Sequence, residues 1–250
     1  MRADLADLAN LAKSLGGIAA CGYVLLLACC GQLGFYIHPR YHLFAAILST
    51  IGIAFLVIDI ILQLKSSVSI IRHRFKFRHI KLASCLSVLI LLAGYLLPPK
   101  PLSANSVAQR ENSIATSQTN YCNIPKPKEG ETNVSINRWR SAFNSCQKLS
   151  YFDNTSITIT GFVSSGTLQN YGYDYFELAR YVISCCAADS IPMKILVEKT
   201  PANSYRDGTW LTVKGKLMQK IINGKAEYVI TESTATAIPQ PEDPYELFGL

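Results

Sequence analysis

The fold is decided first by residues 43–64, which read LFAAILSTIGIAFLVIDIILQL. This run of 22 residues contains a single charged side chain, Asp59. At a rise of about 1.5 Å per residue, a helix of this length crosses a hydrocarbon core of about 30 Å. A buried core helix is the alternative, but the length and the scarcity of charge favour a membrane span. We therefore predict a transmembrane helix over residues 43–64.

Two further apolar stretches flank this one, over residues 17–37 and 82–97. The stretch over residues 17–37 is long enough to span a membrane, whereas the stretch over residues 82–97 is marginal in length. The latter also ends sharply at Pro98 and Pro99, because proline cannot continue the hydrogen-bond ladder of a helix. Taken together, the three stretches predict a transmembrane anchor of three helices over residues 1–98.

Basic side chains orient this predicted anchor. Positively charged loops stay in the cytoplasm. We therefore expect a cytoplasmic N-terminus, an outer turn over residues 38–42, and a C-terminal domain that is extracytoplasmic because the third helix leads outward. If residues 82–97 do not span, the domain is cytoplasmic instead. The loop between the second and third stretches carries no acid and six basic residues, Lys65, Arg72, Arg74, Lys76, Arg78 and Lys81.

Asp59 is the only acidic residue within a predicted span. An ionisable group inside a membrane often marks an ion path or a contact between subunits. It also lies five residues before Leu64, so its carboxylate could reach the cytoplasmic interface. Both interpretations remain open at the level of the sequence.

The net charge of +7 belongs to the anchor. Through Pro98 the chain has nine Lys and Arg against three Asp and Glu, a difference of +6. From Pro99 onward it has fifteen against fourteen, a difference of +1. A nucleic-acid surface needs basic residues gathered on one folded face. We therefore expect no nucleic-acid partner.

The rest of the chain reads as a linker over residues 99–132 and a β-rich domain over residues 133–250. An amphipathic pattern predicts a short helix over residues 135–147. Asn223-Gly224 predicts a tight hairpin, and the internal glycines Gly161 and Gly215 predict bulges or bends. Five strands, two of them bent at a glycine, suggest an all-β domain built as a small OB-like barrel, with an open antiparallel sheet or incomplete sandwich as alternatives. The predicted strands cover residues 156–164, 175–184, 194–198, 209–218 and 226–232.

One motif carries chemistry: Ser184-Cys185-Cys186-Ala187-Ala188-Asp189, at the end of the second strand. The two thiolates could bind a soft transition-metal ion, with Asp189 as an oxygen ligand. They could instead be redox-active, pair with other cysteines, or be small buried residues beside a turn that Asp189 caps. Against a four-ligand zinc site, the domain has no histidine and no CxxC pair.

Other side chains of the domain bear on this motif. Cys122 and Cys146 are the natural disulfide pair if the domain is outside the cytoplasm. Arg180 could pair with Asp189 and lower the pKa of a thiol, or it could point to solvent from a half-buried strand.

Two sequence blocks resemble the YcgQ-type bacterial membrane proteins. The first, FxLxRxxISCCxAD, runs from Phe176 to Asp189, and the second, DGxWLxVxGKL, runs from Asp207 to Leu217. The turn Tyr36-Ile37-His38-Pro39-Arg40-Tyr41 is similar as well. This resemblance implies a permease subunit of the bacterial inner membrane, whose companion is a separate multi-spanning permease of the YcgR type.

We therefore expect a non-enzymatic accessory subunit of a bacterial permease. Its outer domain would bind a soft metal or another thiol-reactive species through Cys185, Cys186 and Asp189. A membrane-tethered thiol redox protein is the main alternative, and a purely structural assembly module is the third.

Overall fold

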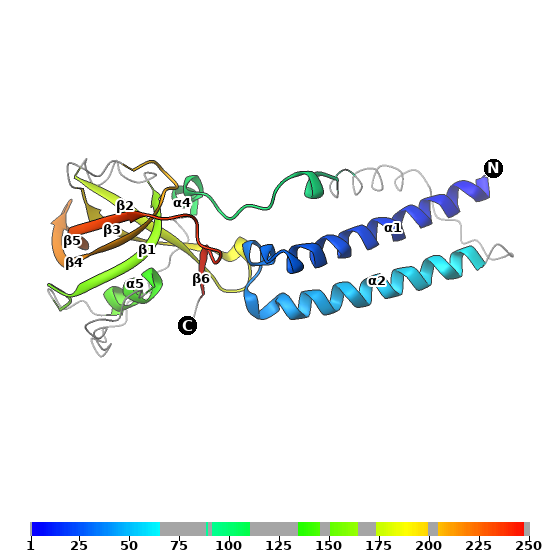
Figure 1. The fold of residues 1–250 in the computed structure, drawn as a ribbon, viewed down its shortest axis with the longest axis horizontal. Coiled ribbons are helices and arrows are strands. Elements are labelled where there is room, and N and C mark those ends of the chain that lie inside the picture. Colours follow the sequence, from blue (N-terminus) through cyan, green and yellow to red (C-terminus); the bar gives the residue numbers. More distant parts are fainter. Residues whose placement is uncertain are drawn as a thin grey trace. The chain divides into compact units, whose positions relative to one another are not determined.

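The structure, a computed structural model, describes residues 2–65, 89, 92–110, 135–145, 151–164, 174–199 and 205–247. The chain divides into two compact units, Met1–Lys100 and Pro101–Leu250. The basic loop over residues 66–81 and most of the predicted third span lie outside the described residues. Figure 1 shows the helical elements of the first unit and the sheet of the second.

The first unit is built on a helix pair, α1 (Arg2–Cys29) and α2 (His42–Lys65), which lie side by side (Figure 1). Two short 3-10 turns join them, η1 (Gln32–Phe35) and η2 (Pro39–Tyr41). Glycines allow the close approach, because a Cβ on Gly17 would lie 2.7 Å from Leu56 and one on Gly52 would lie 3.1 Å from the Cys21 sulfur. Small residues of this kind are typical of closely packed membrane helices.

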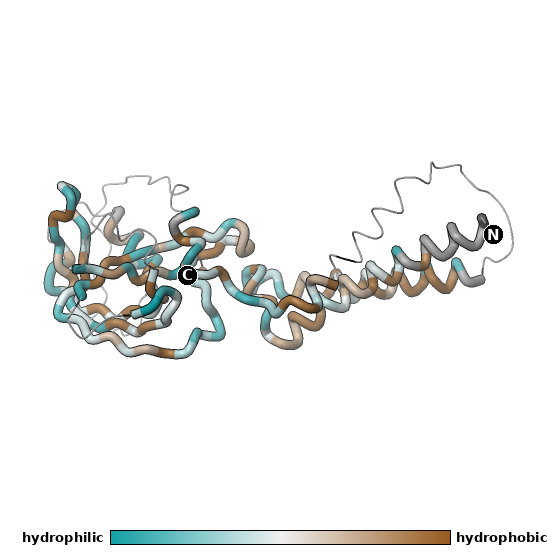
Figure 2. The backbone as a smooth tube through the Cα atoms, turned by 90° about the horizontal axis from the view of Figure 1, so that it is seen from above, coloured by the Kyte–Doolittle hydropathy of each residue, from teal (hydrophilic) through white to brown (hydrophobic). Residues whose placement is uncertain are grey.

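Within the described part of the chain, one helix is long and apolar enough to cross a membrane, Pro39–Gln63. The apolar part of α1, Lys13–Cys29, is shorter. Large apolar side chains along α2, including Leu43 and Phe55, are exposed, and Figure 2 shows the hydrophobic character of both helices. By length and composition, one of the three predicted spans therefore has its counterpart in the structure.

Only the end of the third predicted span is described, as a helical stretch over residues 92–96. It packs on α1, because the Tyr95 hydroxyl donates to the Ala19 carbonyl at 3.0 Å and its ring lies 4.9 Å from that of Tyr23.

The second unit is a mixed β-sheet domain with one main helix, α5 (Ile136–Ser145). The predicted helix and all five predicted strands are present, although three strands are longer than expected. A sixth strand and the short helical segments η3 (Ala104–Ser106) and α4 (Val107–Arg110) were not predicted. The strands are β1 (Ser156–Ser164), β2 (Tyr175–Ile183), β3 (Ile191–Glu198), β4 (Trp210–Ile222), β5 (Lys225–Ala237) and β6 (Tyr245–Leu247).

The first five strands close into a ring. Hydrogen bonding gives the order β1-β4-β5-β3-β2-β6, and β1 also pairs with β2. The β3–β5 and β2–β6 pairs are parallel, while the other pairs are antiparallel. An open antiparallel sheet is therefore excluded, because β1 is hydrogen-bonded along both of its edges.

The predicted hairpin and glycine bends occur where expected. Asn223 and Gly224 both have positive φ, 51° and 76°, as a tight hairpin between twisted strands requires. The β4–β5 register shifts at Gly215, where a Cβ would lie 2.7 Å from the Thr231 carbonyl oxygen. A Cβ on Gly161 would lie 2.6 Å from the Ala179 carbonyl oxygen, at the point where β1 passes from β4 to β2.

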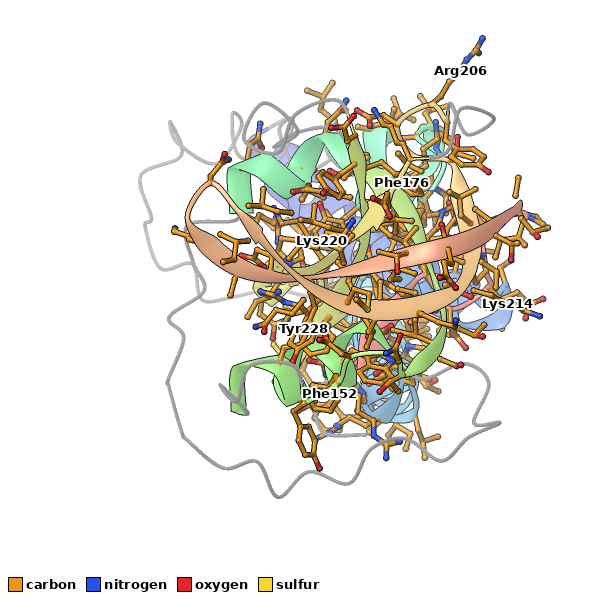
Figure 3. The ribbon with its side chains drawn as sticks, turned by 90° about the vertical axis from the view of Figure 1, so that its left-hand side faces the viewer. Phe152, Phe176, Arg206, Lys214, Lys220 and Tyr228 are labelled. Atoms are coloured by element: carbon orange, nitrogen blue, oxygen red, sulfur yellow. The ribbon has the colours of Figure 1, made fainter. Side chains whose placement is uncertain are left out.

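The interior of the ring holds a cluster of aromatic and aliphatic side chains, to which α5 contributes Trp139 and Phe143. Phe143 stacks on Tyr228 with ring centroids 4.4 Å apart, and Phe152 packs edge-on against Tyr228; both Phe152 and Tyr228 are labelled in Figure 3. Burying such rings is a large source of stability. The interior of the ring therefore sets the stability of the domain.

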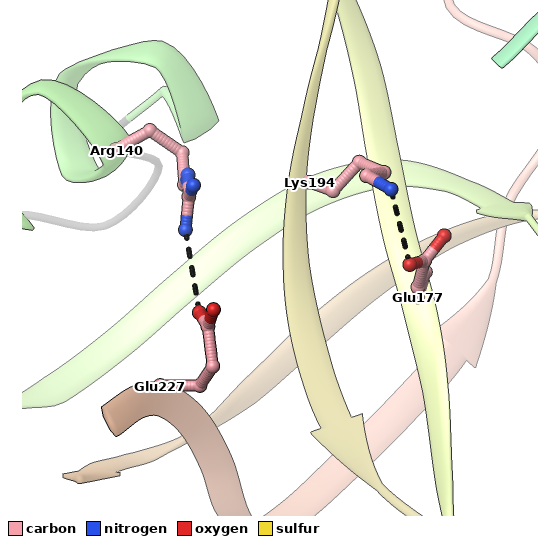
Figure 4. A network of polar contacts seen from close by, with 4 residues as sticks. All are labelled: Arg140, Glu177, Lys194 and Glu227. Carbon is pink, nitrogen blue, oxygen red and sulfur yellow. Dashed lines mark hydrogen bonds and ion pairs between the residues drawn. The ribbon is translucent and has the colours of Figure 1, made fainter. Parts of the chain in front are cut away.

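Ion pairs supplement this packing, and Figure 4 draws two of them. Lys194 on β3 lies 3.2 Å from Glu177 on β2, whose side chain is only 1% exposed. Arg140 on α5 lies 3.8 Å from Glu227 on β5, and both side chains are partly exposed. The first pair links two strands of the ring, and the second links α5 to the ring.

A second apolar cluster covers the outer face of β2. It joins Tyr181 of β2 and Tyr245 of β6 to Ala104 and Val107 from the segment before α5. The Tyr181 hydroxyl donates to the Ser103 carbonyl at 3.0 Å, and the Leu102 N–H donates to the Tyr245 hydroxyl at 2.9 Å. Within the linker predicted over residues 99–132, residues 101–110 thus pack against the β domain, and residues 111–132 lie outside the described residues.

Candidate functional site

The cysteine motif lies in the short connection between β2 and β3. The strand β2 ends at Ile183, and a single 3-10 turn, η6 (Ala187–Asp189), leads into β3 at Ile191. We refer to residues 184–190 as the thiol turn. Because two paired strands enter and leave it, the ring fixes both of its ends.

The thiol turn brings its three predicted ligands together. The sulfur atoms of Cys185 and Cys186 lie 3.5 Å apart, and neither forms a disulfide. Together with a carboxylate oxygen of Asp189, the ligand atoms all lie within 4.8 Å of one another. Cys185 is exposed and Cys186 is half-buried, so the expectation of small buried cysteines does not fit this position.

Asp189 shapes the backbone of the thiol turn. Its carboxylate accepts the N–H groups of Ser184 at 3.2 Å, Cys185 at 2.7 Å and Cys186 at 3.3 Å. Partial burial works to raise its pKa, but these N–H donors outweigh burial and the pKa falls below its ordinary value. Asp189 is therefore a charged cap that holds the two cysteines in place.

The thiol of Cys185 is held in its protonated form. Its hydrogen bonds to the Asp189 carboxylate and to Cys186 raise its pKa to about 11. A thiolate is the form that attacks electrophiles or binds metals. At neutral pH a ligand must therefore displace a proton from Cys185 when it binds.

The two sulfurs can hold one soft ion between them. With metal–sulfur bonds of about 2.3 Å, sulfurs 3.5 Å apart subtend an angle of roughly 100° at the ion. The oxygens of Asp189 already accept three backbone N–H groups, so this residue serves mainly to position the sulfurs. Among the residues that the structure describes, the thiol turn offers the only cluster of three or more such side chains.

Remaining ligands for a bound ion must come from elsewhere. No histidine follows His79 in the sequence. Cys122 and Cys146, the other two cysteines of this half, lie outside the described residues, and so does their predicted pairing. The thiol turn suits a species that needs two sulfurs and carries its other ligands with it.

Arg180 lies away from the thiol turn. Its guanidinium donates to the carbonyls of Asp243 at 2.6 Å and Pro244 at 3.4 Å, and lies over the Trp210 ring at 5.6 Å. Burial lowers its pKa, although Glu246 and Asp243 oppose that effect. Neither predicted interpretation describes this position: Arg180 links β2 to the chain before β6 instead of pairing with Asp189.

Asp59 belongs to the helical unit. Its carboxylate accepts hydrogen bonds from the Ser14 hydroxyl at 2.8 Å and the Gln63 amide at 2.6 Å. Polar side chains often join helices in this way inside membranes. Asp59 therefore links α1 to α2.

Two residues of the site were not predicted, Arg110 and Ser190. Arg110, the last residue of α4, donates to the Ser190 hydroxyl and to carbonyls of the thiol turn. These partners lie 77 to 80 residues apart in sequence. No local pattern could connect them, because periodicity reports only near neighbours.

A family model described as the DUF1980 C-terminal domain matches residues 110–247. This range covers more than half of the chain. The chain belongs to the DUF1980 C-terminal domain family. The matched range begins at Arg110 and ends at the last residue of β6, so it contains the whole ring, α5 and the thiol turn of this DUF1980 domain. No curated protein matches the chain.

Proposed function

We propose that this DUF1980 chain is an accessory subunit of a bacterial inner-membrane permease, and that its β domain captures a soft, thiol-reactive ion. The observation that carries the proposal is the pair of sulfurs 3.5 Å apart in a turn fixed by Asp189. Capture of a divalent soft ion forms two metal–sulfur bonds and releases the two thiol protons to solvent.

The anchor and the partner complete the proposal. Three helices over residues 17–37, 43–64 and 82–97 cross the membrane, with the N-terminus in the cytoplasm and the β domain outside. The resemblance to YcgQ-type proteins supports a YcgR-type permease as the companion. A reporter fused after Leu250 should indicate a location outside the cytoplasm. A cytoplasmic location would contradict this topology.

The ring of strands carries the thiol turn between β2 and β3. We infer an OB-like barrel, because the ring order β1-β2-β3-β5-β4 closes five strands with one parallel pair. A fold of this kind serves many ligands, so the thiol turn and not the barrel indicates what is bound.

Cadmium binding to the full chain in detergent micelles tests the site. A soft ion bound by two thiolates produces a sulfur-to-metal absorption band, which can be titrated. The double variant Cys185→Ser/Cys186→Ser should lose one bound ion per chain. The matched control is Cys29→Ser/Cys30→Ser, which removes the other adjacent, exposed pair and should keep that ion. Equal binding by wild type and the Cys185/Cys186 variant would exclude the thiol turn.

A membrane-tethered thiol redox protein is the second candidate, favoured by the short sulfur–sulfur distance. The raised pKa of Cys185 leaves little thiolate near neutral pH for either chemistry, so it does not decide between the two candidates. Alkylation rates discriminate between the two: fast, selective modification of Cys185 at neutral pH would favour the redox protein. A purely structural module, the third candidate, predicts that the double serine variant keeps full function in cells.

A further inference from the structure

Arg110 donates hydrogen bonds to the second half of the thiol turn, whereas Asp189 accepts hydrogen bonds from the first half. Whereas Asp189 binds the N–H groups of residues 184–186, Arg110 binds carbonyls of residues 187–190. Its Nη1 atom lies 3.0 Å from the Ala187 carbonyl oxygen, 3.3 Å from those of Ala188 and Ser190, and 2.5 Å from the Ser190 hydroxyl. The turn is thus fixed from both ends by charged side chains.

The segment that carries Arg110 is itself anchored on the β domain. We call residues 101–110 the strap. Its docking uses the buried side chains of Ala104 and Val107 and the two tyrosine hydrogen bonds to Ser103 and Leu102. Val107 is fully buried, which makes it the main apolar contact of the strap. Along the chain, the strap begins directly after the helical unit ends at Lys100.

We propose that Arg110 is a positioning residue for the thiol turn, and that docking of the strap sets the affinity of Cys185 and Cys186 for their ion. The inference rests on the proposed capture function and adds its control. A docked strap holds the carbonyls of residues 187–190, so the sulfurs are arranged before the ion arrives. An undocked strap leaves the turn free to relax, and the ion is held less tightly.

The coupling must act in both directions. If docking of the strap strengthens ion binding, ion binding strengthens docking by the same factor.

Affinity measurements on the full chain test the positioning role, with cadmium as the probe. Arg110→Gln should weaken cadmium binding at the thiol turn by about tenfold, as loss of an outer partner of a metal ligand commonly does. Arg110→Lys keeps the charge but offers a single point donor, so it should fall between Gln and wild type. The control is Arg206→Gln, an exposed arginine that points away from the domain (Figure 3) and should keep wild-type affinity.

Hydrogen exchange supplies a readout that a merely structural role would not change. Cadmium should slow amide exchange in residues 102–107 of the wild type, and should slow it much less in Arg110→Gln. Circular dichroism first establishes that each variant is folded. Normal cadmium affinity in a folded Arg110→Gln protein would overturn the inference. Amide exchange in the wild-type strap that is unchanged by cadmium would overturn it as well. Absence of cadmium binding to the wild type would instead overturn the proposed function.

Discussion

In two regions of the β domain a carboxylate accepts backbone N–H groups, but the pKa of that carboxylate shifts in opposite directions. At the thiol turn, the carboxylate of Asp189 accepts three backbone N–H groups. At the start of α5, the carboxylate of Glu246 accepts those of Ile136 at 2.9 Å and Asn137 at 2.8 Å. The pKa of Asp189 is lowered, whereas that of Glu246 is raised, because burial of Glu246 outweighs the N–H groups that donate to it.

The difference separates stability from function. Glu246 is buried and joins β6 to α5, whose aromatic side chains fill the ring. Asp189 lies at the surface and fixes only a turn of a few residues. Loss of Glu246 should therefore disturb the whole domain, while loss of Asp189 should disturb mainly the sulfurs that it positions.

The largest expected effect is that of Glu246→Ala on stability. The variant leaves two buried N–H groups of α5 without their acceptor, which costs about 1–3 kcal/mol in free energy of unfolding. Urea unfolding of the full chain, followed by the fluorescence of Trp139 and Trp210, measures it. Glu242→Ala is the matched control, since Glu242 is an exposed acid of the same segment, and its stability should stay near wild type. Equal stability of the two variants would refute the structural role of Glu246.

Next in size is a pH effect that distinguishes the two carboxylates. The folded pKa of Glu246 lies above its ordinary value of 4.5, so its contribution to stability is greatest below pH 4.5 and is lost as pH rises through the folded pKa. In Glu246→Gln that loss should disappear, as urea unfolding at pH 4.5 and pH 7 would reveal. The same pH dependence in variant and wild type would contradict the raised pKa.

Asp189→Ala should have the smallest effect on stability, about 1 kcal/mol, as expected for loss of a cap. Its contribution has the opposite pH dependence: it is present above the ordinary pKa of 3.8 and is lost as pH falls through the lowered folded pKa. Cadmium affinity should nevertheless fall by up to about tenfold, because the sulfurs lose the cap that positions them. The pKa of Cys185, no longer raised by Asp189, falls and offsets part of that loss. A severe loss of stability with unchanged cadmium affinity would place Asp189 in the same class as Glu246.

Much of the fold could be predicted because its signals are local. Alternation of apolar residues located the five strands of the ring, and Asn223-Gly224 located the hairpin. The short strand β6 was missed because three residues carry too little periodicity. The composition of the strap predicts a linker, and only its tertiary contacts with β2 and β6 show that Val107 is buried.

For the candidate site as well, the sequence indicates residues that are close together in the chain but not contacts between distant residues. Cys185, Cys186 and Asp189 are close in sequence, so their composition revealed them. Arg110 reaches the thiol turn, and Glu246 reaches α5, across 77 to 110 residues, and such contacts leave no mark in a single sequence. For Arg180 the sequence leaves two positions open, beside Asp189 or toward solvent, whereas its guanidinium lies over the Trp210 ring.

The most direct test of the central claim, capture by both sulfurs of the thiol turn, is mass spectrometry of the full chain treated with phenylarsine oxide. This trivalent arsenical joins two thiols to one arsenic and releases one water. The account predicts one adduct on the peptide that contains Cys185 and Cys186. Prior loading with cadmium should prevent this adduct, and the double serine variant should lack it. Failure of that peptide to form the adduct while both thiols are reduced would contradict the account.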